Sequence, residues 1–330
     1  MKRAIVTGAN GHIGSNLCRT LRGRGVEVVA LVRAGSDRRG LEGVDVELVE
    51  GDILEPETLG PAMEGCDTLF HCAAVFAIWA KDVETIMKPA IEGTENVLRA
   101  AKAAGITRVV ATSSVATVGM SPTADRLLDA EHWAEDLQVP YYVAKQRAER
   151  RAWELAEELG LELCTILPTM VLGPHDHRVT PSSKLARDLL SGDSPLVDGG
   201  ANLVDVRDVA EAHALAAERG QPGHRYIVGG ENIENQELGR IIERVSGKKP
   251  GALRAPRWVL ASVASMMELG AWITGKPPQL TRAAVHDVLG RFAWYDLEKT
   301  RSHLGLEPRS PEAVMRATHA WFAREERAAA

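Results

Sequence analysis

A glycine-rich turn that directly follows a short β-branched segment restricts the fold more than any other feature. Residues 4–7 are Ala-Ile-Val-Thr, and the spacing Gly8-x-x-Gly11-x-x-Gly14 comes next, followed by a helical pattern. The order strand, glycine turn and helix places backbone N–H groups and a helix N-terminus where a pyrophosphate can bind. The turn therefore predicts a dinucleotide site, and a glycine-rich turn without a ligand is the alternative.

Short apolar runs alternate with helical patterns along the first half of the chain. Strands are predicted at residues 26–32, 44–49, 68–71, 108–114 and 161–167, with a long helix at 83–104. This alternation is typical of α/β proteins, so we expect a Rossmann-type, doubly wound parallel sheet. Strand and helix return at residues 204–217, another strand is predicted at 225–228, and the chain from residue 236 is mostly helical.

The pattern divides the chain into two lobes. A dinucleotide-binding domain is expected at residues 1–172, with residues 203–230 returning to it. Residues 173–202 and 231–330 would form a smaller, mostly helical C-terminal substrate-binding lobe. Its large apolar residues are expected in a core or along an apolar pocket between the lobes; they are Trp258, Met266, Met267, Trp272 and Trp294.

The end of the second predicted strand bears on the choice of cofactor. Proteins that select NAD commonly place an acid there, which bonds the ribose 2′-hydroxyl. Here the strand ends in Leu31-Val32-Arg33, and no acid precedes Asp37. A guanidinium suits a 2′-phosphate, so Arg33 favours NADP over NAD. A solvated basic loop is the alternative.

A tyrosine and a lysine lie four residues apart at the start of a segment, residues 146–160, that is predicted to be helical. On a helix, Tyr141 and Lys145 would share one face, one turn apart. An ammonium beside a phenol favours the phenolate and lowers the tyrosine pKa from about 10. The phenol could then give and take a proton near neutral pH. An ordinary amphipathic helix with an exposed lysine is the alternative.

Polar residues follow two other predicted strands. In an open parallel sheet the carboxyl ends of the strands face the ligand crevice. Ser114, at the end of the strand from residue 108, could donate to a substrate oxygen or could cap the following turn. Asp52 could accept from an adenine amino group or could cap the segment from Pro56. His71, alone on an apolar strand, is expected to be packed rather than catalytic.

Composition excludes several classes of function. The chain has 330 residues and a formal net charge of −6, with acidic and basic residues mixed along it, so no basic stripe predicts nucleic-acid binding. The four cysteines lie far apart and are expected to be reduced thiols. The segment His175-Asp176-His177 has no third firm ligand nearby, so no metal site is expected.

No targeting or membrane signal is predicted either. The N-terminus has no signal-peptide pattern. The longest apolar run, residues 258–273, is shorter than a membrane span and contains Glu268. A cytoplasmic protein that does not enter the membrane is expected.

Together these motifs resemble the extended short-chain dehydrogenase/reductase family, within the NAD-dependent epimerase/dehydratase superfamily. The glycine triplet, Asp52, the strand end at residues 112–114 and Tyr141-x-x-x-Lys145 occur in the family's order. The resemblance covers nearly the whole chain and is greater to the dihydroflavonol reductase and cinnamoyl-CoA reductase branch. Four segments resemble motifs of that branch: residues 88–94, 141–145, 168–174 and 204–213.

The resemblance implies an NADPH-dependent carbonyl reductase, or the same enzyme working as an alcohol dehydrogenase. In the family's mechanism Tyr141 would protonate the carbonyl oxygen, Lys145 would lower the phenol pKa and bond the nicotinamide ribose, and Ser114 would hydrogen-bond the substrate oxygen. Ser113 is the weaker candidate, because the family's serine aligns with the second of the pair. The implied cofactor contacts are Gly8, Asn10, Gly11, His12, Ile13, Gly14, Arg33, Asp52, Ile53, Ala73, Ala74, Thr112, Tyr141, Lys145, Pro168 and Val171.

Two other functions remain as alternatives. The first is an NAD-dependent nucleotide-sugar epimerase or dehydratase. Against it, Ala90 stands where those relatives usually have Asn, and residues 202–204 lack their diphosphate-binding arginine. The second is a non-catalytic, dinucleotide-sensing regulator, a class that typically loses the tyrosine and lysine. The expected ligands are NADP(H), with NAD(H) possible, and a small carbonyl or alcohol compound; relatives occur as monomers and homodimers.

Overall fold

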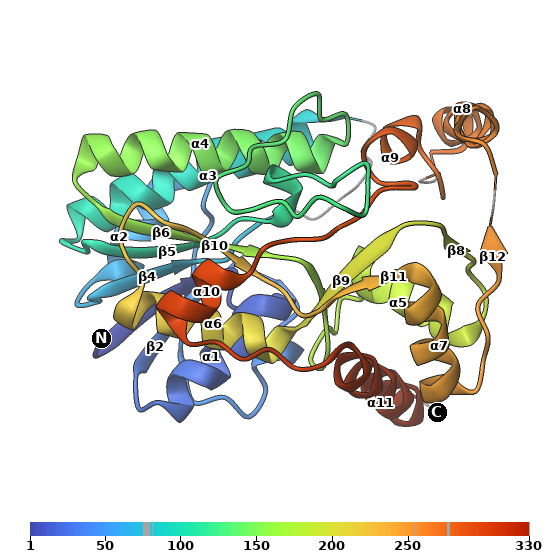
Figure 1. Cartoon of the computed structure of the whole chain (residues 1–330). Coiled ribbons are helices and arrows are strands. Elements are labelled where there is room, and N and C mark those ends of the chain that lie inside the picture. Colours follow the sequence, from blue (N-terminus) through green and yellow to red (C-terminus); the bar gives the residue numbers. More distant parts are fainter. Residues whose placement is uncertain (75–79, 81, 254, 276–277, 330) are drawn as a thin grey trace.

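The computed structural model describes residues 1–74, 80, 82–253, 255–275 and 278–329, and its centre is a sheet of seven parallel strands (Figure 1). The strands are β1 (Arg3–Thr7), β2 (Glu27–Val32), β3 (Glu47–Glu50), β4 (Thr68–His71), β5 (Arg108–Thr112), β6 (Glu162–Pro168) and β10 (Arg225–Val228). Their spatial order is β10-β6-β5-β4-β1-β2-β3, with every neighbouring pair parallel. The predicted doubly wound parallel sheet is therefore confirmed.

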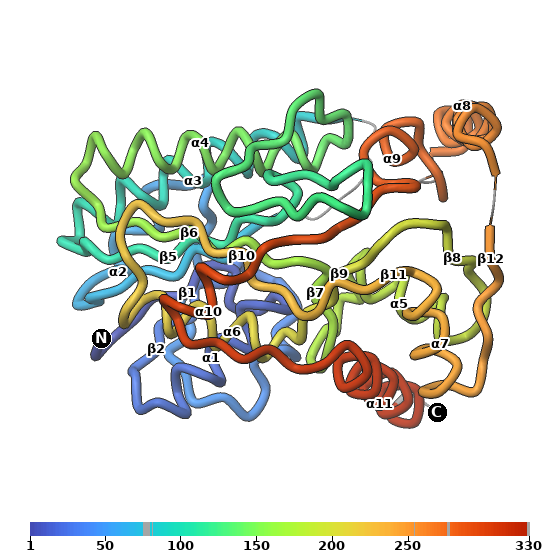
Figure 2. Tube along the Cα trace, in the orientation of Figure 1, coloured from blue at the N-terminus to red at the C-terminus, as the bar shows by residue number. Residues whose placement is uncertain are grey.

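Helices cover both faces of this sheet (Figures 1 and 2). Helices α1 (His12–Gly23) and α6 (Val206–Arg219) lie on one face; α2 (Leu59–Met63), α3 (Glu84–Ala103) and α4 (Pro140–Leu159) lie on the other. Three short 3₁₀ helices, η1 (Arg39–Leu41), η2 (Pro56–Thr58) and η3 (Val115–Thr117), lie in the connections.

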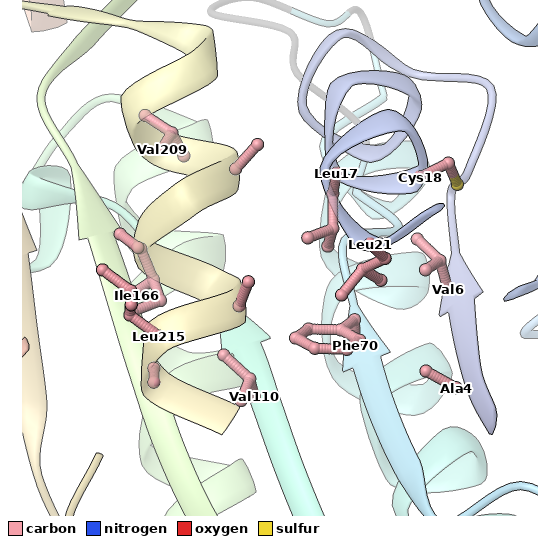
Figure 3. Close-up of a cluster of buried hydrophobic side chains, with 14 of the residues drawn as sticks. Ala4, Val6, Leu17, Cys18, Leu21, Phe70, Val110, Ile166, Val209 and Leu215 are labelled. Carbon is pink, nitrogen blue, oxygen red and sulfur yellow. The ribbon is translucent and has the colours of Figure 1, made fainter. Parts of the chain in front are cut away.

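Side chains along each strand point alternately to the two faces of the sheet, and each face has its own hydrophobic core. Ala4 and Val6 point to the α1/α6 side, where Figure 3 shows them with Leu17 and Phe70, whereas Ile5 points to the α3/α4 side. Successive strand residues face opposite sides, so a strand covered on both faces must be apolar throughout. Burying one such side chain completely stabilises the fold by about 1.5–3 kcal/mol.

The remaining elements lie mostly in the ranges predicted to form the second lobe. A three-stranded sheet has the order β11 (Asn232–Glu234), β9 (Gly200–Asp205), β7 (Met170–Leu172), and a second sheet pairs β12 (Ala252–Leu253) with β8 (Leu196–Val197). The helices are α5 (Pro181–Ser191), α7 (Asn235–Ser246), α8 (Arg257–Thr274), α9 (Arg282–Asp287), α10 (Glu298–Leu304) and α11 (Pro311–Ala329). Helices α5, α7 and α11 enclose a core that includes Leu189, Ile242 and Trp321.

One segment of residues 231–330 packs on the first lobe. Helix α10 contacts α6 and β10, and Leu304 and Leu306 join the core on the α1/α6 side of the large sheet. The Thr300 hydroxyl donates to the Ile227 carbonyl at 2.6 Å. The division into two lobes stays a prediction, and residues 298–306 lie on the side of the first lobe.

Helix α8 differs from what its composition predicts. Trp258, Met266 and Trp272 are 73, 76 and 70 % exposed, so the expectation that they are core residues is wrong. Leu260 and Ala264 on the same helix pack against Val285 of α9, which buries only one narrow stripe of α8. In the described part of the chain, no helix is long and apolar enough to cross a bilayer.

Candidate active site

The glycine turn brings three backbone segments closer together than side chains would allow. Gly8 has φ +65°, and a Cβ there would lie 2.7 Å from the Ala73 Cα after β4. A Cβ on Gly14 would lie 2.2 Å from the Gly8 carbonyl oxygen. The Gly11 N–H donates to that same oxygen at 3.0 Å and Gly11 is the N-cap of α1. The first turn of α1 therefore presents bare backbone, as an anion site at a helix N-terminus requires.

A cleft of about 1190 Å³ opens at the carboxyl ends of β1, β4, β5 and β6 and extends to the second lobe. This is the edge where an open α/β sheet binds ligands. Most predicted site residues line the cleft: Gly8, Gly11, His12, Ile13, Gly14, Arg33, Ala74, Thr112, Ser114, Tyr141, Lys145, Pro168 and Val171.

Four predicted cofactor contacts lie behind this lining. The Asn10 amide donates to the Ser36 hydroxyl and to the Asp37 carbonyl, so it ties the glycine turn to the loop after β2. The Asp52 carboxylate accepts from the Leu54 N–H at 3.0 Å. Ile53 packs under α3 at Gly93, and the Ala73 N–H donates to the Thr7 hydroxyl. That these four residues bind the cofactor stays a prediction.

The tyrosine and the serine meet at the end of β5. Helix α4 begins at Pro140, so Tyr141 and Lys145 lie one turn apart in its first two turns. Tyr141 and Ser114 share a side-chain hydrogen bond. The Ser114 Oγ also accepts from the Ala116 N–H at 3.1 Å, as the N-cap of η3. The interpretation of Ser114 as a cap for the next turn is confirmed, and Ser114 also lines the cleft. That it donates to a substrate oxygen stays a prediction.

The lysine does not lower the phenol pKa in this structure. The Lys145 ammonium donates to the Thr112 carbonyl at 2.9 Å, and burial lowers its pKa to about 8. The pKa of Tyr141 is raised, first by burial and then by Tyr142, and the Ser114 hydrogen bond offsets this only in part. The expected lowering is therefore wrong for the protein without ligands, because the phenol is desolvated while the ammonium bonds elsewhere.

The basic loop after β2 contains one arginine that lines the cleft. Arg38 pairs with Glu50, and Arg39 pairs with Asp37 at 2.7 Å. The exposed Arg33 lines the cleft instead. That Arg33 meets the 2′-phosphate of a cofactor stays a prediction.

The three histidines considered in the sequence analysis, His71, His175 and His177, contact other side chains of the protein. His71 is buried between the Thr7 and Thr94 hydroxyls, at 2.8 and 3.2 Å, which agrees with the prediction that it is packed. His175 and His177 contact the ring of Trp321, both with ring centroids 5.0 Å from it. The Asp176 carboxylate accepts from Thr180. Within the described ranges, no group of three metal-binding side chains is found.

The outer half of the cleft is mainly apolar, and most of the residues that line it were not identified from the sequence, although an apolar pocket was expected. Its walls come from α4, α5, β8, β12, α8 and the segment after α9, and they include Tyr142, Leu185, Leu196, Leu253, Leu260, Met267 and Leu289. Ionisable side chains also line it, among them Arg178 and His286. Of these residues only Met267 was singled out, as lining such a pocket or in the core. The others lie far apart along the chain, and only Tyr142, beside Tyr141, had a local signal.

Comparison with known proteins identifies the family of this chain. A model of the NAD dependent epimerase/dehydratase family matches residues 4–229. A curated Synechocystis protein named "Putative dihydroflavonol 4-reductase" is 35% identical over 325 residues, with 96% of this chain and 94% of that protein covered. Cinnamoyl-CoA reductase 1 of Oryza sativa subsp. japonica is 34% identical, with 76% and 77% covered.

A solved structure agrees over the whole chain. The crystal structure of gox2253 superposes with a TM-score of 0.86 and 36% sequence identity, and 99% of each chain is covered.

Proposed function

We propose that this chain, which belongs to the NAD dependent epimerase/dehydratase family, is an NADPH-dependent reductase of a ketone or aldehyde on a fairly apolar small molecule. Within that family it belongs to the extended short-chain dehydrogenases/reductases and to their dihydroflavonol and cinnamoyl-CoA reductase branch. The reverse reaction would oxidise the matching alcohol. The family is one of NAD(P)-dependent oxidoreductases and epimerases, and the mainly apolar outer half of the cleft supports a reductase of an apolar substrate among these.

The residues around the glycine turn fit a dinucleotide. The space that a Cβ on Gly8 or Gly14 would fill is taken by backbone, and the N-terminus of α1 opens to the cleft. Arg33, at the end of β2, would hold a 2′-phosphate. When bound, the nicotinamide supplies a hydride to the carbonyl carbon or accepts one from the alcohol.

The observation behind the proposed mechanism is the Tyr141–Ser114 hydrogen bond at the cleft, with Lys145 one turn further along α4. As the carbonyl carbon gains hydride, its oxygen gains negative charge. The Tyr141 hydroxyl gives that oxygen a proton, and the Ser114 hydroxyl donates a hydrogen bond to it. The negative charge of the phenolate left behind would draw the Lys145 ammonium, charged below a pKa of about 8, from the Thr112 carbonyl toward the phenolate oxygen. Solvent then returns the proton to Tyr141.

Replacing Tyr141 with Phe tests the proposal. We expect Tyr141→Phe to lower kcat for NADPH oxidation over a panel of ketones and aldehydes by about 10²–10⁴-fold, the usual contribution of a positioned proton donor. Tyr226→Phe is the matched control, because it removes a phenol hydroxyl outside the cleft, where the Tyr226 oxygen accepts from the Gln221 N–H. Full activity of Tyr141→Phe on a substrate that the wild type reduces would disprove the mechanism.

The same assay separates the alternatives. Purified protein that retains NAD and shows no net turnover of NADPH would favour a nucleotide-sugar epimerase or dehydratase. NADPH binding without turnover of any carbonyl would favour a sensing regulator.

A further inference from the structure

A buried ion pair lies directly behind the proposed catalytic group. Glu149 of α4 and Arg225 of β10 have side chains 1 and 6 % exposed. The Arg225 Nε donates to Glu149 Oε1 at 2.9 Å, and Nη2 donates to Oε2 at 3.2 Å. This two-point contact is the strongest geometry that arginine and a carboxylate can form.

Both members of the pair have further partners. Arg225 also donates to the carbonyls of Ala130 and His132, at 2.6 and 2.9 Å, and to the Thr117 hydroxyl at 2.6 Å. The Trp133 ring lies over its guanidinium, with the ring centroid 3.7 Å from Cζ. Glu149 accepts from the hydroxyls of Ser113 at 2.7 Å and Thr165 at 2.8 Å. The pair therefore joins α4, the end of β5, the middle of β6, β10 and the segment before α4.

Stability alone is a weak reason for such a pair. Removing two charges from water is costly, and apolar replacements of buried pairs are often as stable or more stable. The position of Glu149 suggests another role. It lies four residues after Lys145 and eight after Tyr141, so the three share one face of α4. These residues and Ser113 also line one small cavity of about 40 Å³ behind the cleft.

We propose that Glu149, held by Arg225, is a positioning residue for the reductase site: it fixes Ser113, and with it Ser114, against α4, and it keeps a negative charge one turn from Lys145. This inference rests on the proposed function for its kinetic consequences, but its electrostatic consequence at Lys145 is independent of any reaction.

The other groups around Lys145 are neutral near pH 7. Burial raises the pKa of the Cys72 thiol to about 11 and that of Tyr141 as well, and it lowers the pKa of His71 to about 3. His213 of α6 reaches the Thr112 hydroxyl from the opposite side of the sheet, and its pKa is lowered to about 4. Burial lowers the pKa of Lys145, and Cys72 and then Glu149 act in the opposite direction; of these two, Glu149 is the carboxylate. Loss of the Glu149 charge should therefore let Lys145 lose its proton at lower pH.

Glu149→Gln in the full chain tests the inference. We expect kcat for carbonyl reduction to fall at least tenfold, with the dissociation constant for NADPH changed by less than about threefold. The alkaline limb of the kcat–pH profile should move to lower pH by about one unit, the effect of one nearby charge. Glu158→Gln is the matched control: Glu158 lies on the same helix, exposed, with Arg99 at 3.4 Å, and should change neither quantity.

The double variant Glu149→Gln/Arg225→Met separates positioning from folding, because it does not leave Arg225 buried and unpaired. We expect its Tm to recover relative to Glu149→Gln while kcat and the pH profile stay altered. Recovery of kcat and the pH profile together with Tm would overturn the inference and leave the pair purely structural.

A measurement without turnover distinguishes failure of this inference from failure of the proposed function. The pKa of Lys145 can be followed by NMR of ¹⁵N-lysine protein, with the signal assigned through Lys145→Met. We expect the Lys145 pKa to be about one unit lower in Glu149→Gln than in the wild type. Equal values would overturn the inference whether or not the wild type reduces carbonyl compounds.

Discussion

At the scale of single residues, Gly14 is the position with the least room. A Cβ there would lie 2.2 Å from the Gly8 oxygen and 2.9 Å from the Ala9 Cα. We expect Gly14→Ala to destabilise the protein by about 1–3 kcal/mol, as overpacking does, and to weaken NADPH binding by moving the turn away from α1. Urea unfolding and NADPH titration measure the two effects.

Gly23, at the other end of α1, is the matched control for Gly14. Nothing lies within 4 Å of a Cβ built there. Gly23→Ala should be neutral or should stabilise the protein by up to about 1 kcal/mol. If Gly14→Ala and Gly23→Ala changed the free energy of unfolding by the same amount, the close backbone approach at Gly14 would not contribute to stability.

Arg33 is the residue on which cofactor choice should depend. A charge-assisted contact with a 2′-phosphate contributes about 1.5–3 kcal/mol, so we expect Arg33→Asp to weaken NADPH binding by about 10–100-fold and to raise the affinity for NADH. Fluorescence titration with both cofactors measures the ratio. Arg39→Gln serves as control, because Arg39 already pairs with Asp37. An unchanged preference would show that Arg33 does not meet the 2′-phosphate.

Sequence predicts which residues lie near the site better than it predicts their chemistry. The glycine turn, Ser114, Tyr141 and Lys145 all line one cleft, because each has a local pattern at a strand end or helix start. The direction of the Tyr141 pKa shift was missed, because it depends on burial by residues far apart in the chain. Glu149 had a local signal, the spacing of four from Lys145, whereas its partner Arg225 had none.

At the scale of elements, one carboxylate joins the second lobe to the helix of the proposed catalytic group. The Asp287 Oδ2, at the end of α9, accepts the N–H groups of Gln138 and Val139 at 2.9 and 2.7 Å. These residues directly precede α4, which begins at Pro140. Asp287 therefore determines where the first turn of α4 lies relative to the segment after α9, which lines the outer cleft.

We expect Asp287→Asn to raise the KM for the carbonyl substrate and to lower stability by about 1.5–3 kcal/mol, the usual worth of hydrogen bonds to a charged group. NADPH affinity should change less than KM, because most of the predicted cofactor contacts lie at the glycine turn and at the strand ends, away from the first turn of α4. Steady-state kinetics and urea unfolding provide the measurements. Asp296→Asn is the control, an exposed carboxylate that accepts one N–H from Glu298 at 2.8 Å; an equal loss in both variants would contradict the expectation.

Element boundaries were predicted well where burial and periodicity agree. The bounds of β4 and β10 match those expected from sequence. Helix α4 begins six residues before the predicted residue 146, because Pro140 suits a first helical position and packing outweighs the modest helix propensity of Tyr141 to Val143. Helix α5 was not predicted, although Pro181 at its start and the Thr180 cap are the signals of a helix N-terminus.

At the scale of the whole molecule, buried neutral histidines should make the fold sensitive to acid. The Nδ1–H of His213 donates to the Val209 carbonyl, so Nε2 accepts from Thr112. Thr94 donates to the Ala90 carbonyl, so His71 Nε2–H donates to Thr94 and Nδ1 accepts from Thr7. Burial holds the pKa of His213 at about 4 and that of His71 at about 3. Protonating the second nitrogen of either ring would remove the hydrogen bond that this nitrogen accepts.

The sign of the pH dependence follows from proton counts. The unfolded chain takes up a proton on each histidine below pH 6.5, whereas the folded chain does so only near pH 4 or 3. Stability should therefore fall with pH from 6.5 to about 4, by up to about 1.4 kcal/mol per pH unit for each histidine. Urea unfolding at pH 6.5 and 5 measures this slope. A slope unchanged in His71→Gln/His213→Gln would refute the assignment.

The place of residues 298–306 against the α1/α6 side of the large sheet has a consequence for synthesis on the ribosome. Leu304 and Leu306 complete the core that also contains Val110 of β5. At translation rates of about 5–20 residues per second, the nearly 200 residues between β5 and Leu306 take roughly 10–40 s to emerge. Throughout that interval an apolar patch of the nascent chain stays exposed, because Leu304 and Leu306 have not yet emerged from the ribosome. A chaperone would be needed during this time.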